Sequence, residues 1–269
     1  MGNKMKNAPV YFVLTQIRHN PVLNLPTYAA AIQDQMRKSN YPGFAKGINF
    51  SFAIPNSMDS MGTQESGQPT LDQFPRFTFS SADGTRVFII DLNAITFYTT
   101  MYETFEGFTE EFIKGVQIID EVVKLELNER LGLRYLDAVE PPSGEEGLRE
   151  YLSAGVLGIN SSLPKDTNVA RSFSETIFET PKCMVTSRTV IQNAPLGFPP
   201  DLLQIEVKLS EKFKNINGVH AIIDTDAWIE GRREFNIDSI KSELKILQEA
   251  SRLAFDLTVT PAALEAWKG

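Results

Sequence analysis

The chain has 269 residues, of which 42% are hydrophobic and 22% charged, and this balance excludes a disordered or fibrous protein. The formal net charge of -8 leaves no cationic surplus to release counterions from a phosphate backbone, so we expect no nucleic-acid partner. With one cysteine, Cys183, and two histidines, His19 and His220, the chain can form neither an internal disulfide nor a zinc site from these ligands.

No stretch of the sequence approaches the roughly 18 apolar residues of a membrane span, and no apolar block of signal-peptide length follows the first residues. A single cysteine suits a reducing compartment. We therefore expect a soluble cytoplasmic protein that does not contact a membrane.

The first predicted elements are a strand, a helix and a second strand. β-branched and aromatic residues predict a strand over 9–17, and apolar residues at helical spacing predict a short helix from Pro26 to about Lys38. Alternation of apolar and polar residues predicts a strand over 48–54. Residues 55–75 are dominated by Ser, Gly, Gln, Pro and Asp and predict a long loop, either a disordered excursion or a functional lid.

An antiparallel meander over 77–100 follows, turned at Asp83-Gly84, where left-handed backbone conformations are favoured. The next segment predicts a long amphipathic helix that Thr109, or a residue just before it, caps. The helix is predicted from an apolar stripe of Phe105, Phe108, Phe112, Val116, Ile119, Val123 and Leu127. A strand over 131–139 and a linker over 140–147 complete this part of the chain.

In the second part, a short helix over 148–156 and a long strand or hairpin over 176–191 are predicted. Residues 202–209 and 219–229 predict a hairpin. Asn236 is placed to cap a long amphipathic helix, and Thr260-Pro261 opens a final helical turn.

The two parts share short sequence matches. Residues 89–95 and 222–228 share one seven-residue pattern: Ile-Ile-Asp, then any residue, then Asn or Asp, then Ala, then a large apolar residue. In addition, Thr15-Gln16-Ile17 resembles Thr189-Val190-Ile191. We therefore predict an α+β fold of mainly antiparallel sheets, each covered by a long amphipathic helix, with an internal duplication. The halves are 1–140 and 141–269, as two units or as one compact domain.

Four carboxylates give the strongest suggestion of enzymatic chemistry: Asp91, Asp224, Asp226 and Glu230. Gathered near strand ends, they could hold a divalent cation, as in a metal-dependent hydrolase or a nucleotide-handling enzyme. The structural alternative is that Asp91 and Asp224 bond backbone amides of turns. No glycine-rich phosphate loop, nucleophile elbow, HExxH or Cys-x-x-Cys motif occurs, so the motifs imply no cofactor.

Four candidate binding residues lie at or in predicted strands: Arg18 and His19 directly follow the strand over 9–17, and Arg134 and Tyr135 lie in the strand over 131–139. His19, beside Arg18, titrates near neutrality and could serve a site, or could simply bond a turn. Arg134 could hold an anion, or form a cross-strand salt bridge. Alternation along its strand places Arg134 and Leu136 on one face and Tyr135 and Asp137 on the other.

The segments 6–18, 41–44 and 130–136 resemble a sporadically distributed family of uncharacterised bacterial proteins of about this length. The resemblance implies a bacterial origin and patchy inheritance, which suits a mobile or defence-related gene neighbourhood. The family has no established activity, so it supplies no site residues.

Taken together, the sequence favours a non-catalytic binding or assembly component that recognises a protein partner or a second copy of itself, through its sheet faces or residues 55–75. A metal-dependent enzyme is the first alternative. A carrier of a small apolar ligand is the second, because 18 phenylalanines could line a cavity between sheet and helix.

Overall fold

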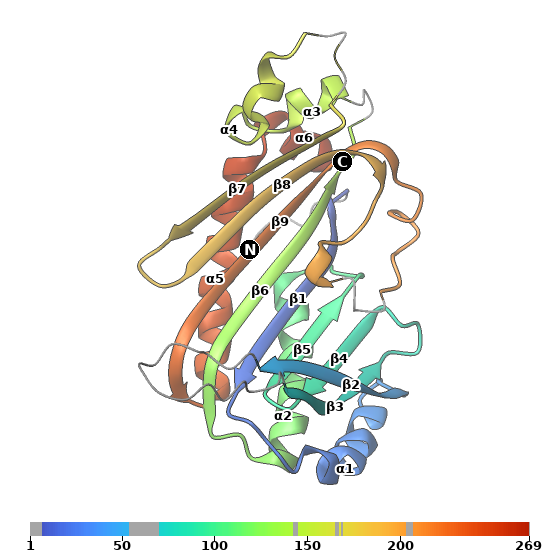
Figure 1. Ribbon diagram of the computed structural model, residues 1–269, viewed down its shortest axis with the longest axis vertical. Coiled ribbons are helices and arrows are strands. Elements are labelled where there is room, and N and C mark those ends of the chain that lie inside the picture. The colour runs from blue at the N-terminus through green and yellow to red at the C-terminus, as the bar shows by residue number, and fades with distance from the viewer. Residues whose placement is uncertain are drawn as a thin grey trace, which may run out of the picture.

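The computed structural model describes residues 7–53, 70–141, 145–164, 167, 169–202 and 207–268. Within these residues the protein is an α+β fold with one nine-stranded antiparallel sheet, in the order β2-β3-β4-β5-β1-β6-β9-β8-β7 (Figure 1). The strands are β1 (Val10–His19), β2 (Gly43–Ala53), β3 (Thr70–Ser80), β4 (Arg86–Asp91), β5 (Ala94–Thr99), β6 (Leu127–Val139), β7 (Arg171–Glu179), β8 (Met184–Pro195) and β9 (Asn217–Glu234).

Six α-helices accompany the sheet in the described part of the chain. They are α1 (Leu25–Lys38), α2 (Phe105–Val123), α3 (Glu145–Tyr151), α4 (Ala154–Leu157), α5 (Ile237–Thr258) and α6 (Pro261–Lys268), with short 3₁₀ turns η1 (Gly158–Ser162) and η2 (Pro200–Leu202). No helix of these residues is both long and apolar enough to cross a membrane.

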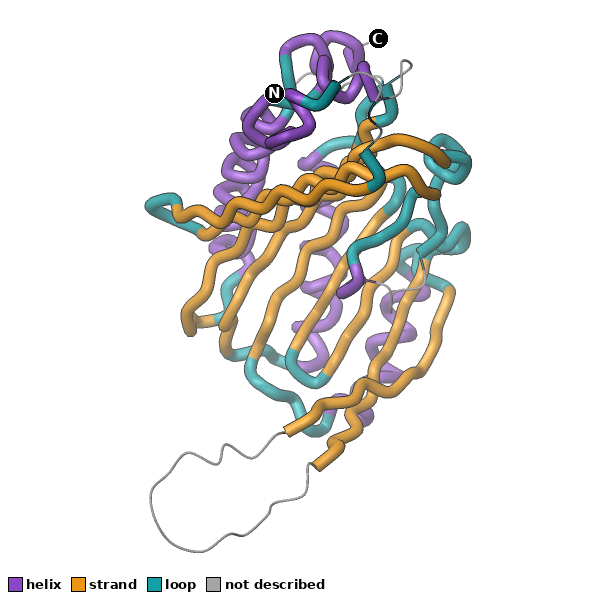
Figure 2. The backbone as a smooth tube through the Cα atoms, turned by 45° about the horizontal axis from the view of Figure 1, so that its top comes forward, coloured by secondary structure: helices purple, strands orange, loops and turns teal. Residues whose placement is uncertain are grey.

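Helices α1, α2 and α5 lie on the same side of the sheet, which we call the helix face (Figure 2). Alternate strand residues such as Phe88, Phe97 and Leu133 point to this face and form one buried cluster with apolar side chains of the three helices. Phe88 stacks on Phe97 at a ring-centroid distance of 4.5 Å, and Phe97 meets Phe108 of α2 at 5.1 Å. Burial of these large rings supplies much of the hydrophobic stabilisation of this half of the sheet.

The other side of the sheet, the opposite face, carries a second buried cluster. Tyr98 and Leu136 pack there against Leu202 and Phe213, which belong to the β8–β9 connection. A third cluster at one end of the sheet joins β9 to α3, α4 and α6, the small helices grouped at the top of Figure 1. Both faces of the central strands are therefore buried.

The two long helices begin at side-chain caps. Asn236 accepts a hydrogen bond from the Ser239 amide at 2.9 Å, as predicted. At the start of α2 the cap is Thr104, which accepts from the Gly107 amide at 3.1 Å. Thr109 lies inside the helix, so its prediction as the cap was wrong and the preceding threonine has that role.

Gly115 allows α2 to approach the sheet closely. A Cβ atom at this position would lie 2.1 Å from Cζ of Phe88, whose ring is fixed by Phe97 and Tyr41. We expect Gly115→Ala to lower the free energy of unfolding by about 1–3 kcal/mol, because the overpacking outweighs the helix propensity that alanine gains. Chemical denaturation measures this change.

The matched control is Gly155→Ala in α4, where an added Cβ meets nothing within 4 Å. It should leave the unfolding midpoint unchanged or raise it slightly. An unchanged midpoint for Gly115→Ala would contradict the close approach of α2.

Several segments differ from the sequence prediction. Helix α2 ends at Val123, so Leu127 of the predicted stripe begins β6 instead, and the predicted helix over 148–156 is divided into α3 and α4. Strand β3 begins at Thr70, so residues 70–75 are strand rather than loop, because pairing with β2 along its whole length overrides their loop-like composition. Residues 54–69 of that predicted loop lie outside the described residues. Residues 207–209 form no strand, and β9 pairs with β6 and β8, so the predicted hairpin of 202–209 with 219–229 is wrong. The prolines and glycine before this segment favour turns, and its apolar side chains pack onto the opposite face instead.

The predicted separate sheets are one sheet, since β1 and β6 pair in its centre and join the two parts of the chain. The predicted boundary at 140–141 lies directly after β6. On either side of the central pair the strand orders correspond, β1-β5-β4-β3 and β6-β9-β8-β7, and a long helix follows both β5 and β9. The matched segments 89–95 and 222–228 occupy different positions, a β4–β5 turn and the middle of β9.

Candidate functional site

Strand β6 contributes polar side chains to both faces of the sheet. Arg134 is buried on the opposite face next to Leu136, whereas Tyr135 and Asp137 border a cavity on the helix face. This arrangement confirms the predicted alternation. It also separates Arg134 from Tyr135, which therefore belong to different sites.

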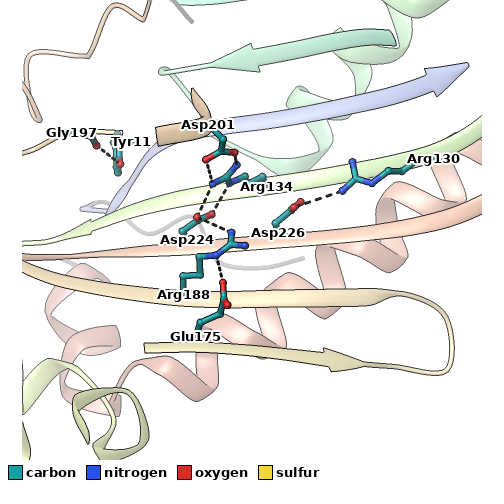
Figure 3. A network of polar contacts seen from close by, with 9 residues as sticks. All are labelled: Tyr11, Arg130, Arg134, Glu175, Arg188, Gly197, Asp201, Asp224 and Asp226. Carbon is teal, nitrogen blue, oxygen red and sulfur yellow. Dashed lines mark hydrogen bonds and ion pairs between the residues drawn. The ribbon is translucent and has the colours of Figure 1, made fainter. Parts of the chain in front are cut away.

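On the opposite face Arg134 is the centre of an ion-pair cluster formed with Asp224, Asp201, Arg188 and Glu175 (Figure 3). Its Nε and Nη2 atoms donate to the two carboxylate oxygens of Asp224 at 2.7 and 2.8 Å, across 90 residues of sequence. Asp201, in the η2 turn, accepts from Nη1 and Nη2. Burial alone would lower the pKa of Arg134, but the hydrogen bonds to the two aspartates raise it above its ordinary value.

Arg188 of β8 extends this cluster toward the sheet edge. Its Nη1 atom donates to Asp224 Oδ2 at 3.4 Å, and its Nε atom donates to Glu175 of β7 at 2.5 Å. Both oxygens of Asp224 therefore already face arginine donors. The cluster is a cross-strand salt-bridge network with its charges paired internally, which favours the structural interpretation of Arg134.

The carboxylates proposed as metal ligands do not converge. Asp91 ends β4 and pairs with Arg76 at 3.1 Å, whereas Asp224 and Asp226 lie in the middle of β9 and Glu230 is exposed further along that strand. Asp226 lies 3.7 Å from Arg130, so its charge also faces an arginine. In the described ranges there is no group of three or more His, Cys, Asp or Glu side chains placed to hold a metal ion.

His19 and Arg18 lie at the far end of β1. The His19 side chain is 1% exposed, and its Nδ1 atom is 2.8 Å from the Asn20 carbonyl oxygen. Burial lowers its pKa, so the ring is neutral at pH 7. Arg18 is exposed beside it. This geometry favours the turn-bonding interpretation of His19.

The helix face contains a cavity of about 1500 Å³ between α2 and α5, which we call the helix-face cavity. Its floor is formed by Tyr135 and Asp137 of β6 and by Thr225 of β9, and its apolar walls include Phe105, Ile113 and Phe255. Charged residues of both signs border it: Glu103, Glu106, Glu110, Lys208, Glu211, Lys212, Lys214, Lys241, Lys245, Glu249, Arg252 and Asp256.

Three hydroxyl groups around this cavity have no hydrogen-bond partner among the described residues: those of Thr109, Thr225 and Ser251. They come from α2, β9 and α5, so both helices and the sheet contribute one each. Buried hydroxyls are normally satisfied, and an unmade bond costs about 1–3 kcal/mol. Because each residue borders the cavity, rotation toward an occupant would supply the missing partner.

Asp137 is the most unusual of the bordering residues. It is 6% exposed, and within the described part of the chain it has no ion pair and its side chain has no hydrogen bond. Burial raises the pKa of its carboxyl group to about 7. The nearby phenol Tyr102, whose ring meets that of Tyr135 edge-on at 5.6 Å, has its pKa raised by burial to about 12 and stays neutral. Asp137 can therefore gain or lose a proton near neutrality.

Sequence reasoning did not select Asp137 as a site residue. The signal that could have found it is the register of β6, in which Leu131, Leu133 and Tyr135 all point to the helix face. Asp137 continues that series, so an acidic residue stands where the pattern calls for an apolar one. A buried acid that borders a cavity and has a raised pKa is a candidate for a functional position.

Comparisons with protein-family models, curated proteins and solved structures find no match for this chain. The resemblance to a sporadically distributed bacterial family therefore stays a prediction, and the site is interpreted from its own geometry.

Proposed function

We propose that the protein binds a small molecule in the helix-face cavity. The observation that carries the proposal is Asp137, a buried carboxyl group that borders the cavity and has no charged partner among the described residues. Ligand sites usually measure about 300–1,000 Å³ and combine an apolar lining with a few polar groups. The helix-face cavity is larger, at about 1500 Å³, and has more charged residues at its border, so a small ligand would fill only the part beside Asp137. The proposal keeps the sequence-based idea of a cavity between sheet and helix, but its ligand has polar groups as well as an apolar part.

The experiment compares two phenylalanine substitutions on α5. Ser251 is 3% exposed and borders the cavity, so Ser251→Phe should fill part of it, whereas Leu253 is 50% exposed and Leu253→Phe is the matched control. The wild type and both variants are examined by native mass spectrometry as purified, and by thermal shift with a panel of amines, carboxylic acids and sugars.

We expect bound small-molecule masses or thermal stabilisation in the wild type and in Leu253→Phe, and their loss in Ser251→Phe. The same response in all three proteins, or no response in any, would contradict ligand binding in this cavity. Failure of Ser251→Phe to fold would contradict it too, because an open cavity accommodates the added ring.

Binding of a protein partner or a second copy, which the sequence favoured, is the second candidate. The observation that supports it is the edge strand β7, where Phe173 and Ile177 are 56% and 57% exposed on the opposite face. Unpaired edge strands readily pair with another chain. The native mass spectra above also report a second copy directly.

An internal duplication is supported by the corresponding strand orders around the β1–β6 pair. In this arrangement α2 and α5 are equivalent helices, and the helix-face cavity lies where the two repeats meet. The short sequence matches carry no weight, because residues 89–95 span the β4–β5 turn whereas residues 222–228 lie in the middle of β9.

A further inference from the structure

Asp137 differs from the other buried or partly buried aspartates of the sheet in its electrostatic environment. Asp224 faces two arginines, Asp226 faces Arg130 and Asp91 faces Arg76. Around Asp137 the described residues place no cation within ion-pair distance. A buried carboxylate without a counter-charge is strongly disfavoured, so Asp137 is either protonated or paired with a cation that reaches it from the cavity.

The surroundings of Asp137 suit a cation attached to an apolar body. Tyr102 and Tyr135 place two aromatic rings beside the cavity floor, and Phe105 and Ile113 add apolar wall. An ammonium group has three donors and no acceptor, which complements a carboxylate, and it is also attracted to aromatic faces. A divalent metal is not favoured, because the described residues offer no cluster of carboxylate, His or Cys ligands there.

We propose that the occupant of the helix-face cavity carries a protonated amine that pairs with the carboxylate of Asp137, and that its apolar portion lies along Phe105 and Ile113. This inference rests on the proposed function and specifies its ligand class. The unpaired hydroxyls of Thr225, on the cavity floor, and of Ser251, on α5, can accept or donate further hydrogen bonds to polar groups of the same ligand.

The test uses matched pairs of probes that differ in charge: 2-phenylethylamine against 2-phenylethanol, and hexylamine against hexanol, with 3-phenylpropionate as an anion. Their affinities are measured by isothermal titration calorimetry at pH 8. Because charge-assisted hydrogen bonds are about twice as strong as neutral ones, we expect the wild type to bind each amine at least about tenfold more tightly than its alcohol.

Asp137→Asn keeps the size of the side chain and removes its charge, so this variant should lose the preference and bind each amine and alcohol within about threefold of each other. Asp226→Asn, on the opposite face, is the matched control and should keep the wild-type preference. A melting curve establishes that both variants are folded.

The outcomes separate this inference from the proposed function. One outcome is that the alcohols or the carboxylate bind the wild type as tightly as the amines, and that Ser251→Phe abolishes this binding. The cavity is then a ligand site, but the proposed ligand class, a protonated amine, is contradicted. If the amine preference persists in Asp137→Asn, the assignment to Asp137 is overturned. If no probe binds and no small molecule accompanies the purified protein, both proposals fail.

Discussion

Asp137→Asn is expected to make the protein more stable at pH 8 and to leave its stability nearly unchanged at pH 4. The folded protein holds the Asp137 carboxyl group at a pKa of about 7, whereas an unfolded chain has it near 3.9. The folded state therefore binds the proton more tightly, and wild-type stability falls as pH rises from about 4 to about 7. The full difference is up to about 4 kcal/mol, or roughly 10 °C in melting temperature.

Thermal melts of the two proteins at pH 4, 6 and 8 measure this difference. The control is Asp34→Asn on α1, whose carboxylate is in water and pairs with Arg37 and Lys38. It should not reproduce the pH-dependent gain. An Asp137→Asn protein that melts below the wild type at pH 8 would show that the carboxylate has a partner within the fold.

Arg134→Met is expected to have a comparably large effect in the opposite direction. It removes both strong hydrogen bonds to Asp224, a residue that is 2% exposed, and leaves that carboxylate with only the longer contact to Arg188. Breaking one side of a buried ion pair costs about 3–5 kcal/mol, because the remaining charge stays buried without compensation. Urea denaturation should show this loss in the free energy of unfolding.

A double-mutant cycle with Asp224→Asn identifies the cause. When the charge of Asp224 is removed as well, Arg134→Met should cost less than in the wild-type background. Arg188→Met should be milder than Arg134→Met, since the Arg188 side chain is 30% exposed. Equal effects of the two arginine substitutions would contradict the central position of Arg134.

Elements with a strong local pattern were predictable from the sequence. The apolar stripe predicts α2 from Phe105 to Val123 and fails only at Leu127, which begins β6. The Asn236 cap places the start of α5, and alternation in β6 assigns the faces of Arg134 and Tyr135. In each case the information lies within a few residues, as a helical repeat, a cap or a two-residue period.

The antiparallel meander over 77–100 was predictable, because tight turns join its strands β3, β4 and β5. Most other strand partners were not, because they depend on contacts distant in sequence. Residues 70–75 look like loop and become strand only beside β2, whereas residues 207–209 look like strand and stay outside the sheet. The joining of all strands into one sheet depends on β1 and β6, which lie more than a hundred residues apart along the chain.

The candidate site was predictable only in part for the same reason. The raised pKa of Asp137 depends on its burial and on the lack of a cation among the described residues around it. Those residues come from α2, β9 and α5, none of which is adjacent to Asp137 in sequence. Arg134 could be selected as a buried cation from the sequence, but its partners Asp224 and Asp201 come from the other half of the chain.

The alternation of β6 also places two contrasting charges close together in sequence. Arg134 is paired with Asp201 and Asp224 on the opposite face. Three positions further on, Asp137 borders the helix-face cavity and has no counter-charge among the described residues. One strand therefore carries a compensated charge on one side of the sheet and an uncompensated acid on the other, so the two environments can be compared at neighbouring positions of the same element.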